Sequence, residues 1–110
     1  LEKLSHQLQL TDQQQAEVKK IMAASKKDGK PIIRDLEKNQ FLFKQALTAD
    51  KYSQTTIDQL AQAQGDGLAK LMSLGAKTSN EIKSILKGDQ IMTFERMQHK
   101  FVKIESQHNK

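Results

Sequence analysis

Cysteine and tryptophan are absent from this chain of 110 residues, proline occurs once, and four phenylalanines and one tyrosine are its only aromatic residues. Without cysteine there can be no disulfide, no cysteine nucleophile and no thiolate metal site. No apolar stretch reaches the roughly 18 residues that a membrane span needs, so we expect no stable membrane insertion. The sequence also lacks a glycine-rich phosphate loop, a nucleophile elbow and a histidine beside a nucleophile. We therefore expect a protein that is not an enzyme and that needs no cofactor.

The composition that remains favours helices. Hydrophobic residues make up 36% of the chain, and the mean hydropathy is −0.69. No run alternates with a period of two, so we predict an all-α fold in a single domain over residues 1–110. The net charge is +5, and all but two of the 18 basic residues are lysine. A basic balance suits acidic protein segments, anionic lipid or nucleic acid, but we favour the alternative explanation, a solvated lysine-rich helix surface.

The segment Leu10-Thr11-Asp12-Gln13-Gln14 predicts the start of a helix. Thr11 followed three residues later by Gln14 is a capping box, in which each side chain satisfies a backbone N–H of the other residue. The end of this motif partly returns near the other end of the chain, as Leu86-Lys87-Gly88-Asp89-Gln90. Lysine stands there in place of threonine, so we expect the second capping box to be lost and Asp89 to cap the last helix.

Residues that cap or break helices predict four helices, over about residues 12–27, 31–47, 53–86 and 89–105. A short lead-in over residues 1–9 precedes them. Gly29 and Pro31 either break the chain between the first two helices or kink it there. Asp50 or Ser53 caps the third helix. The last helix carries Phe94, Phe101 and other apolar residues on one face.

The third helix carries a coiled-coil-like seam for a second copy of the chain, formed by Leu60, Leu68, Leu71, Gly75 and Ile82. Over this span the helix would be about 50 Å long, which exceeds the roughly 34 Å diameter of a compact domain of this size. Either it breaks near Gly65 and Gly67, or the protomer is elongated and buries the seam against a partner. We favour a continuous helix.

Metal binding has little support in the sequence. His6, His99 and His108 do not fall at helical spacings of three or four, so no helix face presents a pair of ligands. The methionines at apolar helical positions are typical core residues. We predict no metal site.

The pattern resembles the Spy/CpxP family of small periplasmic helical proteins, known for their LTxxQ motif. Leu10, Thr11 and Gln14 match the first motif, while Leu86 and Gln90 are what remains of the second. The resemblance covers about residues 4–101, and the spacing from Tyr52 to Leu86 looks especially Spy-like.

This resemblance implies a precursor with a signal peptide, a periplasmic location and a four-helix, hairpin-like protomer in a curved, cradle-shaped antiparallel homodimer. Spy-like members are ATP-independent chaperones that hold unfolded or folding client proteins in envelope stress. CpxP-like members restrain an envelope-stress sensor kinase, and ZraP- or CnrX-like relatives bind metals through histidine motifs that this chain does not show. A chaperone is our first hypothesis and a regulator or metal-responsive protein the second. A nucleic-acid binder is disfavoured, because no recognition motif is visible.

A chaperone of this kind needs apolar patches beside mobile cations. We predict that such a mixed surface binds clients, formed by Leu8, Leu10, Val18, Lys19, Met22 and Lys26. The alternative is that Val18, Ile21 and Met22 are simply buried against the last helix.

Overall fold

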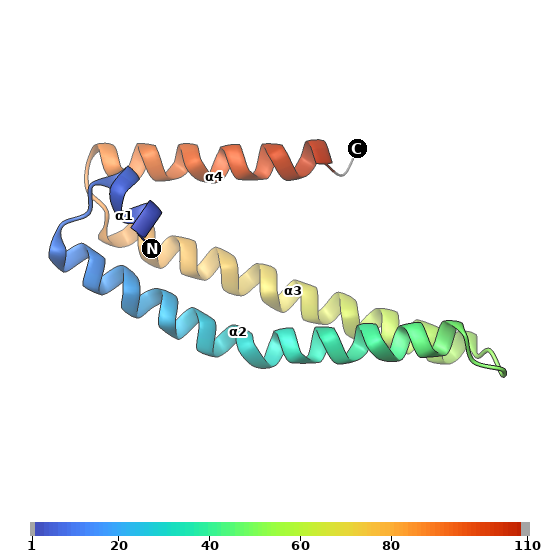
Figure 1. Ribbon diagram of the computed structural model, residues 1–110. Coiled ribbons are helices and arrows are strands. Elements are labelled where there is room, and N and C mark those ends of the chain that lie inside the picture. The colour runs from blue at the N-terminus through green and yellow to red at the C-terminus, as the bar shows by residue number, and fades with distance from the viewer. Residues whose placement is uncertain (1, 109–110) are drawn as a thin grey trace. The chain divides into compact units, whose positions relative to one another are not determined.

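The chain folds into helices joined by short connections (Figure 1). The computed structural model describes the backbone of residues 2–108 and the side chains of residues 3–99. The helices are α1 (Glu2–Leu8), α2 (Asp12–Leu47), α3 (Gln54–Ile85) and α4 (Asp89–His108), and this part of the chain contains no strand. The all-α prediction is confirmed. Two units can be distinguished: Ala23–Thr78 forms one, and the described segments before Ala23 and after Thr78 form the other.

The terminal unit holds the main core. Val18 of α2 is 0% exposed, and Phe94 of α4 and Ile82 of α3 pack with it. Leu4 at the edge of this core belongs to α1, which packs against α4. Residues 2–8 therefore form a helix that completes the core, whereas we predicted a loose lead-in. The remaining buried members of the core are Leu8, Leu10 and Leu86.

The central unit is a hairpin of the C-terminal part of α2 and the N-terminal part of α3, which lie side by side (Figure 1). Glycines allow close packing between the two helices: a Cβ on Gly67 would lie 2.7 Å from Cδ2 of Leu36. A Cβ on the buried Gly29 would similarly lie 3.3 Å from a methyl group of Leu74. These close approaches predict a stability difference between glycines of the same helix.

Replacing Gly65 by alanine should stabilise the chain by up to about 1 kcal/mol, because glycine is that unfavourable inside a helix and a Cβ there meets nothing within 4 Å. The same change at Gly67 should lose most or all of that gain, since the new methyl group must displace Leu36. Urea unfolding followed by circular dichroism measures both variants. Equal stabilisation by the two substitutions would show that Leu36 does not pack against Gly67.

Of the break and the kink that we considered at residues 28–31, the break is wrong, because α2 runs without interruption through Pro31. Figure 1 shows that the helix changes direction near this point. Pro31 and Lys27 are both exposed. The carbonyl group of Lys27, which loses its helical donor at Pro31, can therefore bind water. Packing of the neighbouring Gly29 against α3 offsets the intrinsic cost of proline in a helix.

The third helix is continuous as we favoured, with Gly65 and Gly67 in its interior. Of the two caps considered, the structure selects Ser53, whose Oγ accepts a hydrogen bond from the N–H of Thr56 at 3.3 Å. The last helix extends to His108, beyond the predicted end at residue 105. The predicted packing of Phe101 lies outside the described side chains.

Candidate functional site

The first motif forms the capping box that its residues predict. The backbone N–H of Gln14 donates to Oγ1 of Thr11 at 3.1 Å, and the N–H of Thr11 donates to Oε1 of Gln14 at 3.0 Å. The exchange satisfies two of the N–H groups that a helix start leaves without partners. It fixes the start of α2 at Asp12.

The second motif keeps the glutamine half of the box. The backbone N–H of Lys87 donates to Oε1 of Gln90 at 3.0 Å, as Thr11 does to Gln14 in the first motif. Only the threonine half is lost, because lysine has no acceptor to offer. The prediction that Asp89 caps α4 is therefore wrong: Gln90 makes the capping hydrogen bond, and Gly88 before it takes a positive φ of 54°.

The two motif glutamines also bind each other across 76 positions of sequence. Nε2 of Gln14 donates to Oε1 of Gln90 at 2.9 Å, and Nε2 of Gln90 donates to Oε1 of Gln14 at 3.0 Å. Each amide group donates further to the backbone before the opposite motif: Gln14 to the carbonyl of Ile85, and Gln90 to that of Leu8. This paired-glutamine junction ties the start of α2 to the α3–α4 connection.

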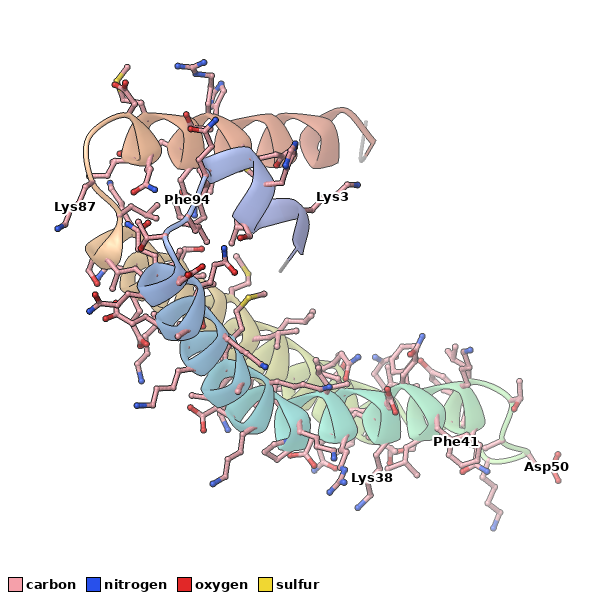
Figure 2. The ribbon with its side chains drawn as sticks, turned by 60° about the vertical axis from the view of Figure 1, so that its left-hand side comes forward. Lys3, Lys38, Phe41, Asp50, Lys87 and Phe94 are labelled. Atoms are coloured by element: carbon pink, nitrogen blue, oxygen red, sulfur yellow. The ribbon has the colours of Figure 1, made fainter. Side chains whose placement is uncertain are left out.

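The leucines of both motifs face the same core. Leu10 and Leu86 are buried, and Leu86 belongs to the connection that leads to Lys87 (Figure 2). The two motifs therefore stabilise the terminal unit, through the packing of their leucines and the hydrogen bonds of their glutamines. Sequence reasoning recognised the local cap but missed the contact between the glutamines, for which the repeated glutamine was the only available signal.

Half of the predicted client-binding surface is inside the core. Leu8, Leu10 and Val18 are buried, so they cannot receive a client in this fold, and for Val18 the core alternative holds. Phe94 of α4 packs with Val18, as the alternative held, and α1 contributes Leu8 to the same core. The sequence did not predict the part played by α1, because the lead-in was not assigned a helix. The exposed members of the set are Met22, Lys19 and Lys26.

The residues of the predicted seam also differ in their exposure. Ile82 is buried in the core of its own chain, Leu71 is half-buried, and Gly75 is exposed with open space around it. Leu60 and Leu68 instead line a depression in the central unit. Ile82 is thus unavailable to a second copy, and that part of the seam is wrong.

This depression, the hairpin groove, has a volume of about 360 Å³ and lies between α2 and α3 of the central unit. Ala61 and Gly65 leave it room, because they have little or no side chain, and a Cβ on Gly65 would meet nothing within 4 Å. Oε1 of Gln64 is buried there without a hydrogen-bond partner, which is unusual for a buried polar atom. The groove is lined by Asn39, Gln40, Phe43, Leu60, Ala61, Gln64, Gly65 and Leu68.

A second depression, of about 680 Å³, lies in the terminal unit beside the first motif. Charged side chains line it, among them Asp12, Glu17 and Lys87. Ile85 and Leu86 also line it, but its lining is more polar than that of the hairpin groove, which makes the groove the better candidate for binding apolar segments.

Neither a metal site nor a membrane span is found in the described part of the chain. Among those residues, no group of three histidine, aspartate or glutamate side chains could hold a metal ion. His6 and His99 are exposed, and the side chain of His108 lies outside the described residues. None of the described helices is both long enough and apolar enough to cross a bilayer.

Comparison with known families gives one match. The model of the LTXXQ motif family matches residues 1–98, which include both motifs and the entire hairpin. The comparisons with curated proteins and with solved structures find no match. The family match covers most of the chain, and the predicted resemblance to the Spy/CpxP type is confirmed: the chain belongs to the LTXXQ motif family.

Proposed function

We propose that this protein is an ATP-independent chaperone of the periplasm, which holds unfolded or partly folded clients in the hairpin groove. The observation that carries the proposal is an apolar groove in a unit that leaves many large apolar side chains exposed. Those side chains are Ile33, Phe41, Leu47, Tyr52, Leu68 and Met72.

The groove suits an unfolded chain better than a folded one. An unfolded segment presents large apolar side chains that a folded protein keeps in its core, and these can enter the apolar groove. Burying one large apolar client side chain contributes about 1.5–3 kcal/mol, so one or two such contacts give weak, reversible binding. Weak contacts of this kind accept many sequences, and release needs no nucleotide.

A dedicated regulator of an envelope-stress sensor kinase is the competing function, and a metal-responsive protein is a further alternative. The groove does not separate a general client from one specific partner, but the range of bound proteins does. A chaperone suppresses aggregation of unrelated proteins, whereas a regulator binds its own partner alone.

The test is an aggregation assay with two unrelated, chemically denatured clients and no ATP, read by light scattering. We expect both clients to remain dispersed at near-stoichiometric amounts of the protein. Failure with both clients would reject the chaperone. A pulldown with a sensor-kinase periplasmic domain and a zinc, copper and nickel titration would then test the alternatives.

We also propose that the protein forms a homodimer, in which a second copy of the chain contacts residues of the groove. Leu60 and Leu68 belong both to the proposed seam and to the groove. A second copy seated on them would therefore compete with clients. Sedimentation equilibrium should show Leu68→Lys shifted toward the monomer, and Leu68 tolerates the change because it is 48% exposed. An unchanged mass would place any dimer interface elsewhere.

A further inference from the structure

The side of α2 that faces away from the groove carries a row of cations within the central unit. At about 100° per residue, its members share roughly a third of the helix circumference and extend about 27 Å along it. All of them are exposed, and Glu37 is the one acidic residue among them. This cationic stripe consists of Lys26, Lys27, Lys30, Arg34, Lys38 and Lys44.

Repulsion between the cations of the stripe destabilises the helix that carries them. Lys26, Lys30, Arg34 and Lys38 follow one another at steps of four, and each such pair of like charges destabilises a helix. Among the side chains that the structure describes, the one ion pair joins Lys83 to Glu95, so no cation of the stripe is in ion-pair contact with a carboxylate, and Glu37 leaves the stripe with a positive excess. An external anionic partner would relieve this repulsion.

Phe41 lies in the C-terminal part of the stripe, between Lys38 and Lys44. It is 60% exposed, and Figure 2 shows it on the same side of α2 as Lys38. Helical spacing also places it between Arg34 and Lys44 and away from Phe43, which lines the groove. An aromatic ring among cations has no part in the core of the hairpin.

We propose that the cationic stripe docks the protein on an anionic lipid surface, with Phe41 entering the headgroup region. Five of the six cations are lysines. Lysine acts as a point charge without the fixed fork that arginine uses to recognise a single phosphate, so the stripe fits a diffuse charged plane. A row that extends about 27 Å along the helix offers such a plane several cations at once. The docking is peripheral, involves no spanning segment, and is independent of client binding in the groove.

The test is co-sedimentation of the full chain with phosphatidylcholine vesicles that contain about a third phosphatidylglycerol, beside vesicles of phosphatidylcholine alone. We expect binding to the anionic vesicles only. The variant Lys30→Gln, Arg34→Gln, Lys38→Gln should weaken it about tenfold or more, because each cation near the surface contributes to binding. The matched control is Lys51→Gln, Lys70→Gln, Lys77→Gln, which removes the same charge from exposed positions outside the stripe and should retain most of the binding.

A second variant tests the aromatic residue. Phe41→Ala should weaken binding that persists at raised salt, because salt screens the lysines but not an inserted ring. Folding of each variant is checked by circular dichroism.

Four results would overturn the proposal. These are no binding to anionic vesicles, an equal loss in the control variant, unchanged vesicle binding in the stripe variant, or a stripe variant that instead loses binding to a double-stranded DNA oligonucleotide or to an acidic client. The last result would assign the stripe to nucleic acid or to clients.

Discussion

Replacing Gln14 by alanine should lower the free energy of unfolding by about 2–4 kcal/mol, because it leaves several buried polar groups without partners. The N–H of Thr11 and the carbonyl of Ile85 each lose a hydrogen bond, and the amide group of Gln90 loses both bonds to its partner. The matched control is Gln13→Ala at the adjacent, exposed position, where we expect a change within about 0.5 kcal/mol. Urea unfolding followed by circular dichroism measures both variants.

The pairing of the two glutamines can be isolated with a double-mutant cycle. Once Gln14 is replaced, the amide group of Gln90 has already lost its partner, so replacing Gln90 as well should cost about 1–2 kcal/mol less than it does alone. Strictly additive effects would mean that the glutamines act separately as caps. A Gln14→Ala variant as stable as Gln13→Ala would contradict the paired-glutamine junction itself.

Filling the hairpin groove should raise the amount of protein needed to suppress client aggregation about tenfold, if one or two buried client side chains provide the binding. Gly65→Leu places a large side chain at the groove, where a Cβ meets nothing within 4 Å, and leucine is the better helix former. The variant should therefore fold at least as stably as the parent. Suppression of a denatured client, read by light scattering, gives the half-effective concentration.

The control for this variant lies in the same helix. Gly75→Leu makes the identical change at a position that also has open space but does not line the groove. We expect suppression by Gly75→Leu to equal that of the parent. If added apolar surface alone strengthened client binding, both variants would suppress aggregation better than the parent. Weaker suppression by Gly65→Leu alone would therefore indicate binding in the groove and not non-specific hydrophobic binding.

Local interactions were the part of the fold that the sequence predicted best. Thr11 and Gln14 are three residues apart, so their cap could be recognised without tertiary information. The cap of the third helix could be narrowed to Asp50 or Ser53, of which the structure shows Ser53. The break expected at Pro31 was wrong because tertiary packing, which the sequence does not show, acts there. The intrinsic preference of proline favours a break, but packing of the neighbouring Gly29 against Leu74, 45 positions away, keeps the helix whole.

The candidate site was less predictable, because an apolar helix position does not show which partner covers it. Val18 and Ile82 fit an exposed surface or a seam as well as a core, until α1 and α4 are placed over them. Gln90 could be identified as a motif remnant, but its bond to Gln14 depends on the two motifs meeting in space. Similarly, Leu60 and Leu68 were predicted as a seam, while Asn39 and Gln40, which complete the groove from α2, gave no signal.

The most direct test of the account is an NMR titration of the isotope-labelled protein, whose 12.5 kDa mass is well suited to the method, with a denatured client. The methyl signals of Leu60 and Leu68 and the side-chain amide signal of Gln64 should shift or broaden, while the methyl signals of the buried Val18 remain in place. The folded form of the same client should leave all of them unchanged. Perturbation confined to the surface around Lys19 and Met22, with Leu60, Gln64 and Leu68 unaffected, would contradict client binding in the hairpin groove.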